Sequence, residues 1–110
     1  MAERGLPQSF SYAAGESISR AFTVDQTITG MTVRFAAKRN ASSTAALTTE
    51  GGTPTATATV TGAQECLIEV SDENTESLSG TYRYSVEIED GAGAKSEVAW
   101  GYLTFSPSMV

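Results

Sequence analysis

The most constraining feature of the sequence is a strict alternation of apolar and polar residues between positions 81 and 89. The apolar side of this segment carries Tyr82, Tyr84, Val86 and Ile88. A repeat of two residues is typical of a β-strand with one buried face. The next residues, 90–93, read Asp-Gly-Ala-Gly and predict a hairpin turn. A return strand is expected from about residue 95 to residue 105, with Trp100 and Tyr102 on one face.

Shorter alternating segments precede this hairpin. They cover residues 10–12, 18–24, 31–38 and 66–70, and a turn at 14–16 separates the first two. Residues 40–62 are rich in Ala, Thr, Ser and Gly and predict weak outer strands, because threonine suits the pleat and Pro54 suits an edge. Residues 71–77 predict a capped helical turn that crosses between two sheets. About seven short strands favour an all-β fold, an antiparallel β-sandwich, over residues 10–105.

The ends of the chain have no such pattern. We expect a flexible N-terminal arm over residues 1–9 and a C-terminal tail over residues 106–110, both able to become ordered on binding a partner. The start, MAERGLPQ, lacks the apolar stretch of a signal peptide. The sequence therefore predicts a protein made in the cytoplasm of its host and not secreted by that route.

Composition excludes several functions. The chain has no histidine and one cysteine, Cys66, so His-dependent triads, His-ligated metals and an intrachain disulfide are excluded. We expect no enzyme, no catalytic residue, no cofactor, no metal site and no small-molecule substrate. The net charge of −6 would repel nucleic acid. Apolar runs are too short to cross a membrane, so no membrane partner is expected.

A resemblance adds to this interpretation. The residues that carry it are Thr75-x-x-Leu78-x-Gly80-x-Tyr82-x-Tyr84-x-Val86-x-Ile88, then Gly101-x-Leu103-x-Phe105, and in the first half Gly15-Glu16, Ile18-x-Arg-x-Phe22, Thr29-Gly30 and Lys38-Arg39. Over nearly the whole chain, the sequence resembles the immunoglobulin-like N-terminal domain of bacteriophage upper-baseplate proteins. The resemblance implies an immunoglobulin-like sandwich and a virion structural protein of the tail, the baseplate or the capsid surface.

Some residues are expected to have structural roles. Tyr82 follows a Leu78-x-Gly80 turn, the position of a tyrosine corner, in which the hydroxyl bonds a nearby backbone group. Phe22 and Phe35 are expected in the core. Cys66 is also expected there, as a small apolar residue.

The candidate interface has two parts. The threonines of the weak outer strand, Thr55, Thr57 and Thr59, form a poorly defended edge that a neighbouring subunit can extend. Trp100 either packs against its own domain or, with Tyr102, anchors an interface. The expected partners are copies of the chain itself and other virion proteins. The alternative is a module that binds carbohydrate or protein on a host surface, with Trp100 or Tyr102 as a stacking platform.

Overall fold

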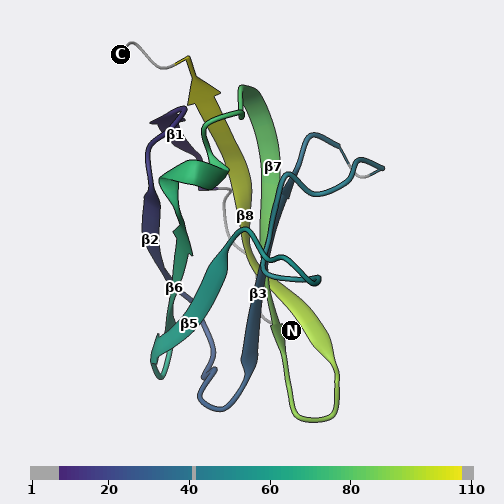
Figure 1. Cartoon of the computed structure of the whole chain (residues 1–110). Helices are drawn as coiled ribbons and strands as arrows, with labels where there is room; N and C mark the ends of the chain where they lie inside the picture. The colour runs from purple at the N-terminus through teal and green to yellow at the C-terminus, as the bar shows by residue number, and fades with distance from the viewer. Residues whose placement is uncertain (1–7, 41, 108–110) are drawn as a thin grey trace.

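The computed structural model describes residues 8–40 and 42–107, which form two packed β-sheets (Figure 1). The larger sheet has the order β1 (Phe10–Ala13), β8 (Lys95–Ser106), β7 (Gly80–Glu89), β3 (Thr32–Lys38) and β4 (Leu47–Thr48). The smaller sheet has the order β2 (Ile18–Thr23), β6 (Glu65–Val70) and β5 (Thr57–Gly62). A short 3-10 helix, η1 (Asp72–Asn74), lies between β6 and β7 and carries the chain from one sheet to the other.

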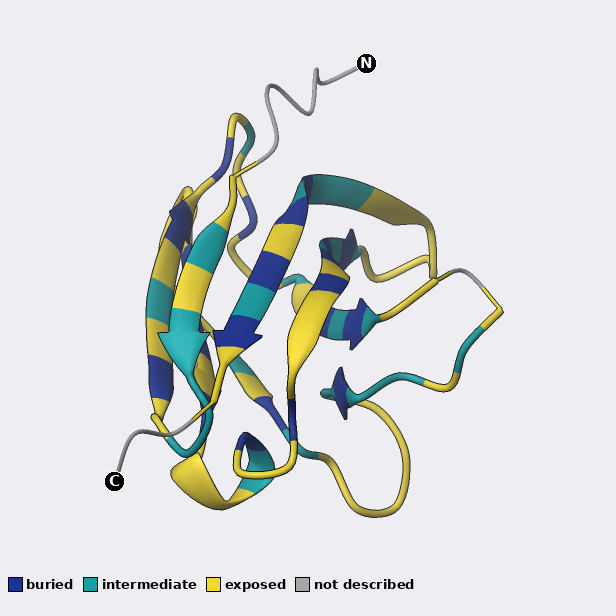
Figure 2. Cartoon of the chain, turned by 90° about the horizontal axis from the view of Figure 1, so that it is seen from above, coloured by how far each residue is buried: buried dark blue, intermediate teal, exposed yellow. Residues whose placement is uncertain are grey.

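The strand alternation predicted from the sequence is confirmed. Buried and exposed residues alternate along the strands (Figure 2), as expected when one face of each sheet packs against the other sheet. The predicted turn at 90–93 closes the β7–β8 hairpin. The Asp90 carboxylate accepts hydrogen bonds from the backbone N–H groups of Ala92 (2.9 Å) and Ala94 (3.0 Å).

The pairing of β1 differs from the predicted antiparallel arrangement. β1 lies parallel to β8, with Phe10 opposite Leu103 and Tyr12 opposite Phe105. The chain then turns at residues 14–16 and joins the smaller sheet as β2. β1 and β2 belong to different sheets, so they do not form the hairpin that would pair them antiparallel. The described residues form eight strands, close to the expected seven or so.

The turn between β1 and β2 is fixed by a buried threonine. Gly15 has φ 89°, a conformation that favours glycine. Its N–H donates a 3.1 Å hydrogen bond to Thr75 Oγ1, and the same hydroxyl donates a 2.7 Å bond to the Glu16 carbonyl oxygen. Thr75 is the only polar residue among the described ones that is fully buried. It therefore links the entry of β2 to the crossing between the sheets.

Aromatic rings join the two layers. The Tyr84 ring on β7 lies 5.7 Å from Phe22 on β2 and 5.9 Å from Phe35 on β3, between ring centroids. Phe10 packs on the same group, 6.0 Å from Phe22 and 6.1 Å from Tyr84. Such pairs each contribute about 0.5–1.5 kcal/mol beyond their buried area. Phe22 and Phe35 are buried as predicted, and so is Cys66.

The Ala- and Thr-rich segment forms the predicted outer strands. β4 is an edge of the larger sheet and β5 an edge of the smaller one. The two edges are tied together, because the Thr55 N–H donates to the Thr48 carbonyl oxygen and the Thr48 N–H donates to Thr55 Oγ1, both at 2.9 Å. The predicted helical turn is also present, but Ser71 makes no side-chain cap bond. Its hydroxyl instead accepts a bond from Asn74 Nδ2.

The predicted arm and tail lie mostly outside the described residues. Residues 1–7 and 108–110 belong to that part. Gln8, which the sequence assigns to the arm, is attached to the fold: its N–H donates a 2.9 Å bond to the Trp100 carbonyl oxygen. Within the described ranges no helix has the length and apolar character needed to cross a membrane.

Candidate interaction face

The outward side of the larger sheet carries the most distinctive surface of the molecule. Strand pairing places its residues in rows across β8, β7 and β3. One row contains Tyr102, Arg83 and Lys38, the next Trp100, Ser85 and Ala36, and the next Glu97, Glu87 and Arg34. Because Ser85 and Ala36 are small, the middle row is hollowed. The hollow has a volume of about 660 Å³ and its wall includes Phe35, Asn40 and Glu50. We call this surface the outer face.

Two aromatic residues lie on the outer face. Tyr102 is 42% exposed, and among the described residues it is the only large apolar side chain that is exposed. Its ring meets Trp100 edge-on, with 6.0 Å between ring centroids. The Arg83 guanidinium lies 4.7 Å from the Trp100 ring centroid, so Trp100 is half-buried beneath a cation.

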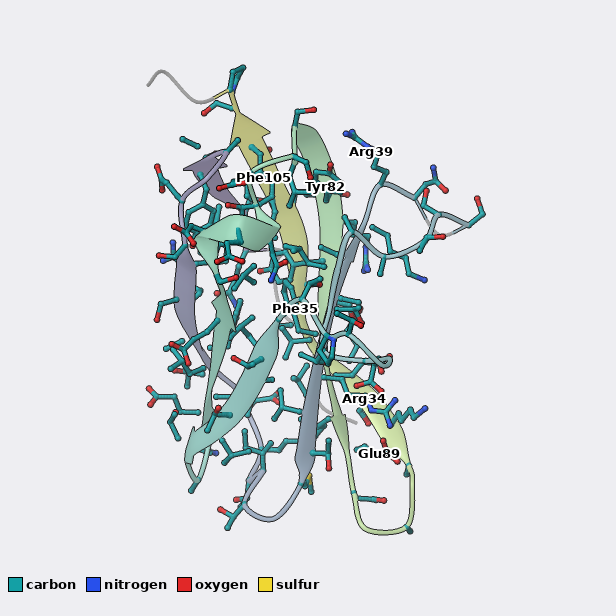
Figure 3. The ribbon with its side chains drawn as sticks, in the orientation of Figure 1. Arg34, Phe35, Arg39, Tyr82, Glu89 and Phe105 are labelled. Atoms are coloured by element: carbon teal, nitrogen blue, oxygen red, sulfur yellow. The ribbon has the colours of Figure 1, made fainter. Side chains whose placement is uncertain are left out.

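Ion pairs hold the polar side chains of the outer face in place. Arg83 Nη1 lies 3.5 Å from Glu97 Oε2, and the Ser85 hydroxyl donates a hydrogen bond to the same oxygen. At the other end of the face, Arg34 pairs with Glu50 at 3.1 Å and also with Glu89 (Figure 3). Arg34 Nε is shielded from solvent and has no hydrogen-bond partner among the described groups. The side chains of the outer face are thus preorganised, and the N–H group at Arg34 Nε remains available as a hydrogen-bond donor.

Charge on the outer face changes sign along the strands. Lys38 and Arg83 are paired across β3 and β7 at one end, next to Arg39. At the other end acidic residues outnumber basic ones. These are Glu50, Glu87, Glu89 and Glu97 against Arg34 and Lys95. The face therefore has a basic end and an acidic end.

The rest of the molecule is strongly acidic. Among the described basic residues, only Arg20 belongs to the smaller sheet. Exposed acids cover β6 and the crossing that follows it: Glu65, Glu69, Asp72, Glu73 and Glu76. The acidic excess of the chain therefore lies on the side away from the outer face.

The Tyr82 corner is built differently from the predicted one. The Tyr82 ring is buried after the Leu78-x-Gly80 turn, and its hydroxyl accepts a 3.0 Å bond from Arg39 Nη2. The same nitrogen donates to the Ser79 carbonyl oxygen at 2.6 Å (Figure 3). The guanidinium carbon lies 4.5 Å from the Tyr82 ring centroid. We expected the tyrosine hydroxyl to bond a nearby backbone group directly. Instead, the Arg39 side chain bonds both the hydroxyl and a backbone carbonyl oxygen.

The predicted interface residues fall on two separate surfaces. Thr57 and Thr59 are exposed on β5, at the edge of the smaller sheet, whereas Trp100 and Tyr102 lie on the larger sheet. Thr55 is half-buried and its hydroxyl is bonded to Thr48. Trp100 packs within its own domain and also borders the exposed Tyr102, so both of its predicted roles fit this position.

Sequence reasoning missed most polar residues of the outer face. Arg83, Ser85 and Glu97 were not singled out as candidates, although the alternation within 81–89 already places Arg83 and Ser85 on the outward side. The missing information was strand order, since only the pairing of β3 with β7 brings Lys38 next to Arg83. No group of three or more acidic or cysteine side chains within the described ranges is placed to hold a metal ion.

Comparisons with known proteins bear on the fold. No family model matches the sequence, and no curated protein matches it. Solved structures do match. The ZIG-8 IG1 homodimer structure has a TM-score of 0.54 at 12% identity and covers 97% of this chain and 88% of its own. The natural killer cell receptor NKp44 has a TM-score of 0.51 at 16% identity, covering 93% of this chain and 100% of its own. The fold is immunoglobulin-like.

A third match is a ZIG-8–RIG-5 IG1–IG1 heterodimer, with a TM-score of 0.50 at 14% identity over 92% of this chain and 83% of that one. At such identities the likeness concerns the fold alone. In antibody domains, the residue two positions after the corner tyrosine is a cysteine of the disulfide between the sheets. In this immunoglobulin-like domain that position is Tyr84, whose ring packs on Phe22 of the opposite sheet.

Proposed function

We propose that this protein is a non-enzymatic structural component of a bacteriophage particle, an adaptor that holds copies of itself or other virion proteins in the tail, the baseplate or the particle surface. The proposal joins two supports. One is the sequence resemblance to immunoglobulin-like domains of phage upper-baseplate proteins. The other is a surface on the folded domain that is suited to contact with another protein.

The outer face carries the proposal. Tyr, Trp and Arg are the residue types that contribute most to protein–protein binding energy, and here Tyr102, Trp100 and Arg83 are in contact with one another. Their side chains are already held by packing and by the Glu97 ion pair. Little conformational freedom is therefore lost on binding, which favours a rigid docking surface.

The matched solved structures add support of a coarser kind. ZIG-8 IG1 is described as a homodimer and, with RIG-5 IG1, as a heterodimer. At least one domain of similar fold, ZIG-8 IG1, thus associates with its own kind. Fold alone does not determine function, so the likeness supports protein association in general and the phage role rests on the sequence resemblance.

The direct test is to look for the chain in particles. Particles of the phage whose genome encodes this chain would be purified by density gradient. Their proteins would be quantified by mass spectrometry against the major capsid protein. We expect the chain in intact particles at a fixed copy number per particle. Its absence from particles, with the chain recovered only in the soluble fraction, would overturn the virion role.

A second candidate is the host-surface binding module. The observation that favours it is the exposed Tyr102 ring beside the hollow lined by Asn40, Ser85 and Glu87, since an aromatic wall next to hydrogen-bonding groups is typical of carbohydrate sites. A glycan array probed with the wild-type protein and with Tyr102→Ala tests it. Binding that disappears in the variant supports this candidate; no glycan binding by the wild type excludes its carbohydrate form.

A further inference from the structure

We propose that the outer face binds a second copy of this chain, in a two-fold symmetric dimer whose axis lies in the plane between the two faces and runs perpendicular to the strands. This inference rests on the proposed function, because it names the partner for which the outer face is built. In such a dimer both copies contribute the same surface, so each contact between two different residues occurs twice.

The distribution of charge along the strands selects this axis. Two outer faces can meet with their strands parallel or antiparallel, depending on the direction of the two-fold axis. With the axis along the strands, the basic end at Lys38 and Arg83 would lie against the same basic end of the partner. With the axis across the strands, it lies against the acidic end, so that Arg83 approaches Glu87 of the partner subunit. Like charges placed opposite each other across an interface repel, which disfavours the first orientation.

The middle row fits the contact that this axis produces. The row of Trp100, Ser85 and Ala36 lies midway between Arg83 and Glu87, so it falls near the axis. The small side chains of Ser85 and Ala36 leave the hollow of about 660 Å³, and the exposed Tyr102 ring stands at its border. With this axis β8 of one copy lies over β8 of the other. The Tyr102 ring of each copy therefore approaches Glu97 of the partner subunit, at the border of that copy's hollow.

The acidic side of the molecule favours the same arrangement. Exposed acids on β6 and the following crossing, such as Glu69 and Glu73, would repel one another if the smaller sheets met. Contact through the outer faces places these acids at the two far ends of the dimer. The alternative contact through the β5 edge would bring them close together. Repulsion between net negative copies therefore disfavours the smaller sheet and leaves the outer face as the contact.

The broad side of the molecule that contains the outer face is large enough for a stable dimer. The molecule measures 43 × 31 × 28 Å along its principal axes, and the β7–β8 hairpin runs along most of its length (Figure 1). A standard interface buries about 800 Å² on each partner. An area of that size fits within one broad side of the molecule.

Charge reversal tests the proposal. Sedimentation equilibrium would be measured for the full chain, for Arg83→Glu, for Glu87→Arg, and for the double variant. We expect a dimer for the wild type, a dissociation constant at least about tenfold weaker for each single reversal, and recovery in the double variant. Recovery is diagnostic, because within one chain these two residues lie two rows apart and only the proposed axis brings them together. Glu69→Arg, the same charge change on β6, is the matched control and should leave dimerisation unchanged.

Circular dichroism and thermal melts of each variant separate loss of folding from loss of the dimer contact. Tyr102→Ala is a further variant of the outer face, and it disturbs no ion pair. A monomeric wild type at millimolar concentration would overturn the dimer. So would a double variant no tighter than the singles, or a Glu69→Arg variant as weak as Glu87→Arg. These outcomes are independent of the particle test: a monomer found in virions leaves the virion role intact, and a dimer absent from virions leaves the dimer intact.

Discussion

The Tyr84 hydroxyl donates a 2.5 Å hydrogen bond to the carbonyl oxygen of Gln8 and so links β7 of the immunoglobulin-like domain to the chain just before β1. The Gln8 backbone reaches this position because it crosses directly over Gly101 of β8. A Cβ atom at Gly101 would lie 1.9 Å from the Gln8 carbonyl oxygen. The position of the start of β1 therefore depends on two features: Gly101 has no side chain, and Tyr84 has a hydroxyl that bonds Gln8.

Gly101→Ala should therefore displace the beginning of β1 and weaken the fold. The added methyl group meets backbone atoms, which cannot rotate away as a side chain can, so we expect a loss of about 1–3 kcal/mol in the free energy of unfolding. Urea unfolding followed by tryptophan fluorescence measures it. Gly91→Ala is the matched control, because its Cβ would meet nothing within 4 Å; equal effects of the two substitutions would contradict the explanation.

Tyr84 should also make the fold sensitive to alkali. Burial raises the pKa of the Tyr84 hydroxyl from 10.0 to about 12, an effect that nearby Arg20 partly offsets. The unfolded chain therefore loses this proton first. The stability from this group is complete below pH 10 and is lost as the pH rises toward 12.

The measurement compares unfolding free energies of the wild type and Tyr84→Phe between pH 8 and pH 12. The variant lacks the bond to Gln8, so it should be less stable by about 1–3 kcal/mol near neutral pH. The difference should shrink through the alkaline range, because only the wild type has this hydroxyl to ionise. A difference that stays constant with pH would refute the pKa assignment.

Thr75→Val should destabilise the protein more than Thr75→Ser. Valine keeps the volume of the side chain but removes the hydroxyl that accepts from the Gly15 N–H and donates to the Glu16 carbonyl oxygen. Leaving buried backbone groups without a partner costs about 1–3 kcal/mol, whereas serine retains the hydroxyl. Thermal melts of both variants decide the point, and hydrogen exchange at Gly15 should accelerate in Thr75→Val alone.

Cys66 should resist thiol reagents in the native protein. Burial raises the pKa of its thiol above 9.0, and the charge of neighbouring Glu65 raises it further. Reagents therefore reach the thiol poorly, and the thiol forms little of the reactive thiolate. Labelling with a disulfide reagent at pH 8 should proceed orders of magnitude more slowly than in urea. Fast labelling under native conditions would place Cys66 outside the core.

The sequence was sufficient to predict where the strands lie, but not which strands pair with one another. Alternation between 81 and 89 and the Asp-Gly turn after it predicted β7 and its hairpin, because one buried face imposes a period of two on any strand. The parallel position of β1 was missed. It depends on contacts between Gln8 and Gly101, residues distant in the sequence with no local signal of their own.

The candidate site shows the same division. Trp100 and Tyr102 were recognised from residue type and from their shared face. Their companions were not, because Arg83 becomes a ring neighbour of Trp100 only once β7 and β8 are aligned. The Tyr82 corner was located by its spacing from Gly80, yet its partner, Arg39, comes from the end of another strand. Residue patterns thus predicted which side chains matter, and strand pairing decided what they touch.

The rings of Phe22 and Tyr84 bridge the two layers at the point where antibody domains have a covalent link. Cys66 is the only cysteine in the chain, so no intramolecular crosslink exists for glutathione or dithiothreitol to break. The melting temperature should accordingly be the same in reducing and in oxidising buffer. Folding therefore needs neither a thiol oxidase nor a disulfide isomerase.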